Sequence, residues 1–568
     1  MEQNQTENPM KPLQETAPET AAAASDAVKK KHSLDWPDVR KWITLMACTF
    51  VFILGILLVF YYIWGPGYAE FHADCSDTLY WAEAAMQGKG LINPDFNYAA
   101  VMPLGGNLFM QLWYPFFGMS MTTHSLGMTT FFIVFTAALF WLLREMKWSL
   151  NWTLAGAGGL LTALLCSAKV REIFWGHIIY YSLGLLFLLI GLALVLHIYN
   201  LHEKEQTRSV RIQKGLFLAL LLVMFLLSCT NSTTAIALFA LPVAAALFCE
   251  RFLDHTVPLT DKKNILGGIM LVICLIGILG GLKLGDWIAG GVQGLYANAH
   301  SDFTAESSWW EHVEKLPLEF LYLLGLEVDT DTALASLNGA KIILLLFYAA
   351  LIVILPLAAL LSYRKIEEKG LRMLIWAHFT SSAFILIGYI CGMLSTANWR
   401  MSPILVTSFL VSLSYLRWLY AKADSRRLSV LLLIPFIWNS AQGVLNVFDM
   451  APKAHLTSAN YQLIAFLKEK GLDYGYATFW NSHSLTVQSN SECVVRAVHI
   501  NAEGLQMNPY QGNAEWYEDQ PGQEEYFLLM SAGERDALIA SGSPVAEEEY
   551  TQYEYLDFII WVFEENLF

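Results

Sequence analysis

Acidic side chains and one histidine crowd a short stretch of the sequence just after its first long apolar run. This stretch contains Glu70, His72, Asp74 and Asp77. Charged groups held against a membrane are costly, so they indicate either a structural cap or chemistry. One of the two aspartates, or Ser76, can cap the helix that the pattern predicts over 78–87. Two aspartates together with Glu70 exceed what capping needs.

The two aspartates have the chemistry of a general base. A carboxylate near a low-dielectric boundary has a raised proton affinity, which suits removal of a proton from an acceptor hydroxyl or amine. The sequence therefore predicts Asp74 or Asp77 as the catalytic base and does not decide between them. No pair of histidines has the spacing of a helical metal site, so we predict no metal centre, while a divalent ion at the two aspartates stays open.

Positive charge is rare on the side of the predicted membrane where this stretch lies. Two short segments carry it, and their cationic or titratable side chains are Lys169, Arg171, His177 and Arg400. One interpretation is that these residues anchor the chain at the membrane interface. The other is that they bind, together with Glu70 and His72, the phosphate of a lipid-linked substrate. They would then stabilise the charge on a phosphate leaving group, and that chemistry requires no cofactor.

The composition indicates a protein with many membrane-spanning helices. Hydrophobic residues make up 55% of the sequence and charged residues only 15%, whereas soluble proteins carry about 25% charged residues. Apolar runs long enough to span a bilayer recur along the chain and predict about eleven spans. The runs lie near 43–64, 123–143, 149–167, 178–199, 215–229, 232–250, 264–282, 341–362, 373–394, 402–420 and 428–445.

The distribution of basic residues predicts the topology. Lys and Arg gather in alternate loops, which places the N-terminus in the cytoplasm and the C-terminus outside. We predict three parts: a disordered cytoplasmic tail over 1–36, a transmembrane domain over 37–445 with long outer loops at 65–105 and 283–340, and an extracytoplasmic domain over 450–568.

The polar C-terminal region predicts a small α/β domain. Helix start signals and β-rich runs predict three helices and three strands in it. The helices cover 460–470, 482–489 and 532–541, and the strands cover 474–479, 525–530 and 555–563. No catalytic motif, glycine-rich phosphate loop or metal-ligand spacing is visible in this region.

Cysteine usage bears on the compartment. Most of the eight cysteines lie inside apolar runs, and only Cys75 and Cys493 look solvent-facing. The sequence therefore predicts no disulfide framework. This favours a bacterial cell membrane over a eukaryotic reticulum.

Two motifs give the sequence a resemblance to the GT-C glycosyltransferases, which are multi-pass membrane enzymes that use polyprenyl-phosphate sugars. The first is Asp77-Thr-Leu-Tyr80-Trp81-Ala82-Glu83, similar to the family's aspartate followed by Tyr-Ala-Glu, although the register can instead place Asp74 at the aspartate. The second is Asn398-Trp-Arg400-Met-Ser-Pro403, which resembles the family's Arg-Tyr-x-x-Pro. Here Met401 stands where Tyr is usual, and one residue fewer precedes the proline.

The resemblance implies an α-helical polytopic membrane fold of GT-C type with a lateral cavity, followed by the small soluble α/β domain. It implies that an outer-loop aspartate is the base for transfer of a sugar, with inversion, from a polyprenyl-phosphate carrier. The acceptor would be a cell-envelope glycan, a glycolipid or a protein, and nucleic acid is not among the expected partners. The alternatives are a transporter or lipid flippase without sugar chemistry, and an assembly protein. Transporters usually carry ionisable residues mid-span and internal repeats, and neither is evident in this sequence.

Overall fold

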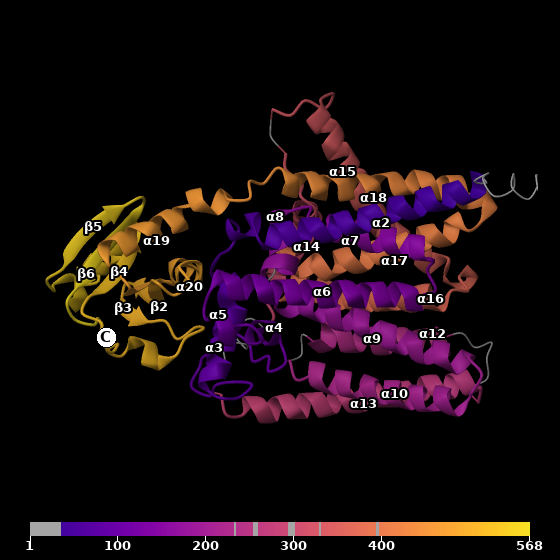
Figure 1. Ribbon diagram of the computed structural model, residues 1–568, viewed down its shortest axis with the longest axis horizontal. Helices are drawn as coiled ribbons and strands as arrows, with labels where there is room; N and C mark the ends of the chain where they lie inside the picture. The colour runs from indigo at the N-terminus through magenta and orange to yellow at the C-terminus, as the bar shows by residue number, and fades with distance from the viewer. Residues whose placement is uncertain (1–35, 232–234, 254–259, 293–301, 329–330, 393–396) are drawn as a thin grey trace, which may run out of the picture.

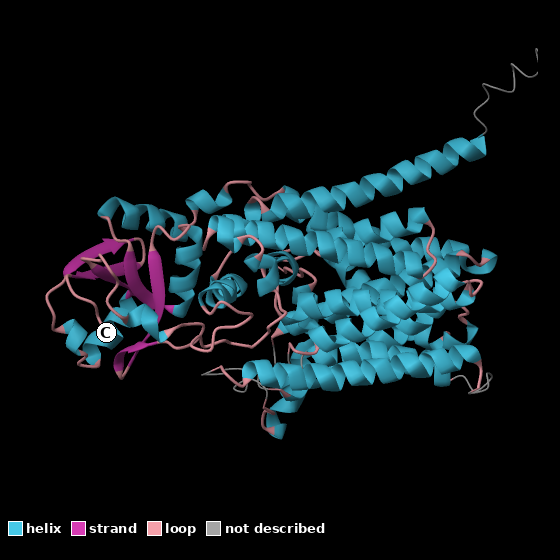
Figure 2. Cartoon of the chain, turned by 60° about the horizontal axis from the view of Figure 1, so that its bottom comes forward, coloured by secondary structure: helices cyan, strands magenta, loops and turns pink. Residues whose placement is uncertain are grey.

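Long helices form a bundle, and all the strands lie at one end of it (Figures 1 and 2). The computed structural model describes residues 36–231, 235–253, 260–292, 302–328, 331–392 and 397–568, so residues 1–35 of the predicted tail lie outside the described part. The long helices are α2 (Trp36–Ile63), α6 (Met121–Glu145), α7 (Leu150–Ala163), α9 (Tyr180–Glu203), α10 (Arg208–Ser228), α12 (Leu241–Phe252), α13 (Lys262–Ala289), α14 (Glu306–Leu323), α15 (Leu337–Leu361), α16 (Lys369–Cys391), α17 (Ser402–Tyr420) and α18 (Arg426–Phe448).

Nine helices in the described part of the chain are long and apolar enough to cross a membrane, or ten if one bent pair is a single span. Two of the eleven predicted runs account for the difference between this count and the prediction. The run at 149–167 folds as α7, which ends at Ala163, and the helix that follows is bent from it by 115°. In the run at 232–250, residues 232–234 lie outside the described part, and the helical residues that follow include the π-helical turn η4 (Ile236–Ala240) and α12.

Helix α2 precedes the acidic stretch at 70–77, and α7 precedes the basic segment at 169–177. These two helices pack very closely. A Cβ atom on Gly158 of α7 would lie 2.7 Å from the Cα atom of Phe52 in α2, so only glycine permits this approach. Small residues at helix contacts let backbones approach in this way in membrane proteins. Because α2 leads into the acidic stretch and α7 leads into the segment at 169–177, this contact holds the two segments near each other.

The loop after α2, residues 65–105, is called the acidic loop below. The helix predicted over 78–87 is confirmed as α3 (Asp77–Gln87), and a turn of 3-10 helix, η2 (Ala73–Ser76), precedes it. The remaining short elements nearby are η1 (Pro66–Tyr68), α4 (Asn107–Gln111), α5 (Tyr114–Phe117), α8 (Ala168–Arg171), the π-helical turn η3 (Glu172–Gly176) and η7 (Asn398–Met401).

Residues 450–568, called the sheet domain below, contain one six-stranded sheet in the order β3-β2-β1-β4-β6-β5. Strand β1 is parallel to β2 and to β4, and the other pairings are antiparallel. The three predicted helices and three predicted strands are present, whereas β2, β3 and β5 were not predicted. The elements are α19 (Ala459–Lys470), β1 (Tyr474–Thr478), α20 (Phe479–Gln488), β2 (Val494–Asn501), β3 (Gly504–Met507), η10 (Ala514–Tyr517), β4 (Tyr526–Ser531), α21 (Ala532–Ala540), β5 (Thr551–Tyr555) and β6 (Phe558–Phe563).

Both faces of the sheet are buried, and each packs in a different core. Successive strand residues point to opposite faces. Ala477 of β1 belongs to a core shared with Leu463 and Leu467 of α19. Its neighbour Tyr476 belongs to a larger core that includes Tyr80 and Phe96 of the acidic loop. The sheet domain is therefore packed on the acidic loop through a continuous apolar core.

Candidate active site

Asp74 and Asp77 lie at the start of α3, and neither caps it. Asp77 is its first residue, Ser76 stands at the N-cap, and no side chain makes a capping hydrogen bond there. The Ser76 hydroxyl instead donates to the carbonyl oxygen of Ala73 (2.5 Å). The capping interpretation thus does not account for the two aspartates. Asp77 is 4% exposed and Asp74 is half-buried.

Within the described part of the chain, the Asp77 Oδ1 atom is buried without a hydrogen-bond partner. Burial, followed by the negative charge of Asp74, raises the pKa of the Asp77 carboxyl well above its usual range. Burial also raises the pKa of Asp74; the positive charges of His72 and Lys169 oppose this rise, and the charge of Glu172 adds to it. A negative charge on Asp74 therefore disfavours ionisation of Asp77.

Glu172 joins the acidic loop to the segment at 169–177. Its Oε2 atom accepts from the Lys169 Nζ atom (2.5 Å) and lies 3.3 Å from the His72 Nε2 atom. Burial opposes protonation of His72, but Cys75 and Glu172 outweigh it and raise the pKa of this side chain to about 11. His72 and Lys169 therefore both face the Glu172 carboxylate close to Asp74. The Lys169 ammonium also lies 5.0 Å from the ring centroid of Trp399, which brings the segment of Arg400 to the same place.

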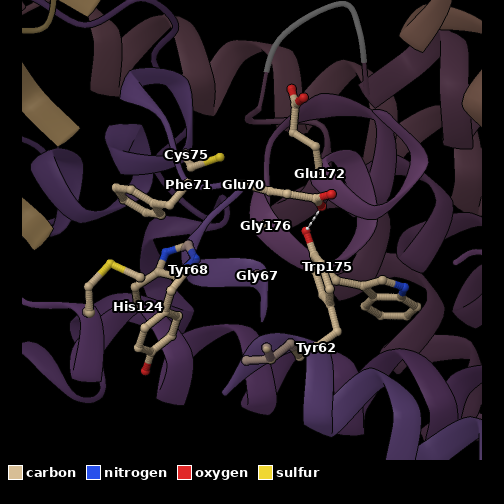
Figure 3. A pocket seen from close by; sticks show the side chains of 12 residues that line it. Tyr62, Gly67, Tyr68, Glu70, Phe71, Cys75, His124, Glu172, Trp175 and Gly176 are labelled. Atoms are coloured by element: carbon tan, nitrogen blue, oxygen red, sulfur yellow. Dashed lines mark hydrogen bonds between the residues drawn. The ribbon is translucent and has the colours of Figure 1, made fainter. Parts of the chain in front are cut away.

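Glu70 and Arg171 pair with each other. The Arg171 Nε atom donates to the Glu70 Oε2 atom (3.0 Å), and a second bond joins the Nη2 and Oε1 atoms. The Nη1 atom donates to the carbonyl oxygen of Leu165 (3.1 Å). Glu70 also accepts from the Tyr62 hydroxyl (2.6 Å), as Figure 3 shows. These bonds occupy all three guanidinium nitrogens of Arg171, which is only 7% exposed.

A small cavity lies beside this ion pair. It measures about 10 Å³, and its lining includes Glu70, Glu172, Cys75 and His124 (Figure 3). A space of this size holds about one water molecule. Cys75, which looked solvent-facing in the sequence, is buried in this region, and Cys493 is buried in the sheet domain. The eight cysteines are all unpaired in the described residues.

The remaining two predicted residues lie nearby with free polar atoms. Arg400 donates from its Nη1 atom to the carbonyl oxygen of Gly388 (3.0 Å). Its Nε atom and the Nε2 atom of His177 are buried and have no partner among the described residues. The structure thus gathers His72, Asp74 and Lys169 around Glu172, and it closes Glu70 with Arg171 in a separate pair.

Residues of the sheet domain also reach the aspartates, which the sequence did not predict. Burial, followed by the charges of Asp77 and Asp74, raises the pKa of Tyr510. Gln511 is fully buried against the acidic loop. The segment Asn508-Pro-Tyr-Gln-Gly-Asn513 carries only a turn signal, so nothing in its local sequence indicates this position.

A larger polar cavity opens between the ends of α15 and α18 on the side of the sheet domain. It measures about 570 Å³, and Arg171, Lys341, Asn439 and Gln442 belong to its lining. The amide nitrogens of Asn439 and Gln442 have no partner among the described residues. In the described part of the chain, no three His, Cys, Asp or Glu side chains gather closely enough to hold a metal ion.

The fold is similar to that of solved membrane glycosyltransferases. ArnT from Cupriavidus metallidurans in the apo state has a TM-score of 0.55 and 10% identity, covering 92% of this chain and 98% of that chain. The same protein bound to undecaprenyl phosphate has a TM-score of 0.54 and 11% identity, covering 90% and 97%. The oligosaccharyltransferase of Archaeoglobus fulgidus tethered with an acceptor peptide is less similar, with a TM-score of 0.48, 12% identity and coverage of 90% and 73%.

No protein-family model matches the sequence, and no curated protein sequence is significantly similar to it. At 10% and 11% identity, the likeness to ArnT defines the fold. The chain has a GT-C fold, that is, an α-helical polytopic membrane fold with a C-terminal sheet domain. This confirms the fold class that the sequence predicted.

Proposed function

We propose that the protein transfers a sugar from a polyprenyl-phosphate carrier to an acceptor at the extracytoplasmic face of a cell membrane. The observation that carries this proposal is the pair Asp74 and Asp77 in the acidic loop of a GT-C fold, where the buried Asp77 Oδ1 atom has no hydrogen-bond partner among the described residues. A buried polar atom without a partner calls for an explanation. A substrate hydroxyl would supply one, because it can donate a hydrogen bond to the Asp77 carboxylate.

In this proposal Asp77 is the general base. The acceptor oxygen or nitrogen attacks the anomeric carbon, and its proton passes to the Asp77 carboxylate. The bond between the anomeric carbon and the phosphate oxygen breaks, and its electron pair leaves with the carrier phosphate, so the configuration inverts. Asp74 raises the proton affinity of Asp77 through its charge, which makes Asp77 a stronger base. This chemistry requires no metal, so we expect transfer to survive chelation of divalent ions.

We assign the carrier phosphate to Lys169 and Arg400, with His72 as a third cation. Lys169 lies against Trp399, the residue before Arg400, which places the two basic segments next to each other. The solved ArnT structure with undecaprenyl phosphate supports a polyprenyl carrier. Three of the five N–H donors of Arg171 bond Glu70 and Leu165, so we assign Arg171 to holding the acidic loop in place. His177 lies beside this site with its Nε2 atom available.

The test is sugar transfer by the purified protein from radiolabelled polyprenyl-phosphate sugars. Asp77→Asn and Asp74→Asn are compared with Asp95→Asn, an exposed aspartate of the same loop. We expect Asp77→Asn to lose transfer, Asp74→Asn to lose part of it and Asp95→Asn to retain it. Unchanged transfer by both site variants overturns the assignment of the base. No transfer by the wild type from any of the carriers, together with movement of carrier across vesicle bilayers, favours the flippase alternative.

The topology has its own test. We propose that the N-terminus is cytoplasmic and that the acidic loop and sheet domain are extracytoplasmic, as the basic loops indicate. A cysteine introduced at the exposed Glu548 of the sheet domain should react with a membrane-impermeant maleimide in intact cells. Labelling only after the cells are opened contradicts this orientation.

A further inference from the structure

The loop of the sheet domain that follows β3 is fixed against the acidic loop by backbone pairing. Phe96 forms an isolated antiparallel bridge with Asn513. The backbone N–H of Asn97 donates to the carbonyl oxygen of Gly512 (2.9 Å), and the backbone N–H of Gln511 donates to the carbonyl oxygen of Asn97 (2.9 Å). The main chain of Gln511 is therefore held in register with the acidic loop.

The side chain of Gln511 is oriented by two donors. Its Oε1 atom accepts from the Trp81 indole Nε1 atom (2.7 Å) and from the Ala99 backbone nitrogen (3.1 Å). Both groups can only donate, so they identify the oxygen and exclude the flipped amide. The Nε2 atom consequently points away from Trp81 and Ala99. This nitrogen is buried and has no hydrogen-bond partner among the described residues.

Asp77 lies beside this orphaned nitrogen. Asp77 and Trp81 are four residues apart on α3, so their side chains share a helix face, and Gln511 is bonded to Trp81. The Asp77 Oδ1 atom is a buried acceptor and the Gln511 Nε2 atom a buried donor, and neither has any other hydrogen-bond partner among the described residues. Hydrogen bonding by the Gln511 side chain lowers the pKa of Asp77 against the larger effect of burial.

We propose that Gln511 is a positioning residue for Asp77: its side-chain amide donates to the ionised carboxylate and holds it toward the acceptor. The inference rests on the proposed function and extends it, because the active site is then complete only when the sheet domain is docked. Through Gln511 the sheet domain would take part directly in catalysis, a role that the sequence of this domain does not indicate.

The test is Gln511→Glu, which has almost the same shape. The variant keeps an oxygen for Trp81 and Ala99 but replaces the donor facing Asp77 with a second acceptor. We expect the transfer rate to fall at least tenfold and the acid limb of the pH–rate profile to move to higher pH by about one unit or more. The control is Gln506→Glu, at an exposed position of β3, which adds the same charge to the same domain and should change neither. Combined with Asp77→Asn, Gln511→Glu should cause little further loss.

The outcomes separate this inference from the proposed function. If the wild type transfers sugar, Asp77→Asn does not, and Gln511→Glu matches the wild type in rate and pH profile, this inference alone is wrong. A lower unfolding temperature with an unchanged pH profile also contradicts it, because that result describes a purely structural glutamine. If Gln511→Glu does not fold, Gln511→Met, of similar size and without charge, takes its place: slower transfer by folded protein supports the inference, and unchanged transfer overturns it.

Discussion

Carboxylates at the two ends of the helical bundle differ in how many partners they have. At the end away from the sheet domain, Glu203 of α9 is surrounded by lysines from three other segments. The Nζ atoms of Lys147, Lys369 and Lys263 lie 3.1, 3.0 and 3.5 Å from its carboxylate oxygens. At the other end, Asp77 is buried with an oxygen that has no partner in the described residues.

The difference distinguishes charges that hold the fold together from charges that cost stability. Glu203 ties four segments by ion pairs, which is a structural role with small individual contributions. A buried carboxylate oxygen without a partner lowers the free energy of unfolding. Such a group is expected where it has a function, such as binding or catalysis. The pair of Glu70 in the acidic loop and Arg171 in the segment at 169–177 is the intermediate case, since its charges are largely buried but bonded to each other.

The largest expected effect separates activity from stability at Asp77. Asp77→Asn should reduce transfer by about 10²–10⁴-fold, the usual contribution of a general base. The same substitution removes a buried carboxylate, so the free energy of unfolding should stay the same or rise. Transfer kinetics and denaturant unfolding in detergent measure the two quantities. A variant that loses stability in proportion to activity would make Asp77 a structural residue like Glu203.

The next effect concerns the Glu70–Arg171 pair. Arg171→Met leaves the half-buried Glu70 carboxylate with only the Tyr62 hydroxyl as a partner, and this should cost about 3 kcal/mol of unfolding free energy, the lower end for a broken buried pair. The double variant with Glu70→Gln should recover most of that loss. Denaturant unfolding of both variants measures it. If Arg171→Met instead keeps its stability and raises the KM for the carrier, Arg171 binds phosphate, as the sequence hypothesis had it.

The third prediction uses pH. Because burial raises the pKa of Asp77, transfer should increase by up to about tenfold per unit as the pH rises from the ordinary aspartate value near 4 toward the raised value. Stability should move in the opposite direction. The native state holds this proton more tightly than the unfolded state, so unfolding free energy falls as pH rises through the same window. Transfer rates and unfolding midpoints across pH test both trends, and Asp77→Asn should show neither.

The sequence predicted the parts of this comparison that are local. The aspartates, the helix that follows them and the basic segments can all be recognised within a few residues, because hydrophobic periodicity and charge are local properties. The capping hypothesis for Asp74 and Asp77 was reasonable on the same grounds, and only the geometry at Ser76 removed it.

The missed features depend on contacts between distant residues. Gln511 reaches Trp81 across more than four hundred positions, so no window of sequence reports it. Strand β2 was missed because Arg496 interrupts its apolar pattern; this side chain lies over the Trp516 ring, with 3.8 Å from its Cζ atom to the centroid. Cys493 follows the polar residues Ser491 and Glu492, which suggested exposure, yet the fold buries it.

A smaller effect is expected at Lys169. Lys169→Gln removes a cation that we assign to the carrier phosphate, so the KM for the carrier should rise about tenfold, equivalent to about 1.4 kcal/mol. Lys89→Gln, an exposed lysine of the acidic loop, should leave the KM unchanged. Steady-state kinetics with varied carrier concentration measure both. An unchanged KM for Lys169→Gln would leave Lys169 as the ion-pair partner of Glu172 and nothing more.

The smallest effect is expected at the other end of the bundle. Glu203→Gln removes one carboxylate from three ammonium groups, two of which are largely exposed, with side-chain exposures of 69% and 46%. Exposed ion pairs contribute little, so the unfolding free energy should fall by about 1 kcal/mol. Transfer per folded molecule should not change, because Glu203 is the last residue of α9, at the end of the bundle opposite to Asp77. Loss of transfer without loss of stability would break the comparison, since it would place functional charge at both ends of the bundle.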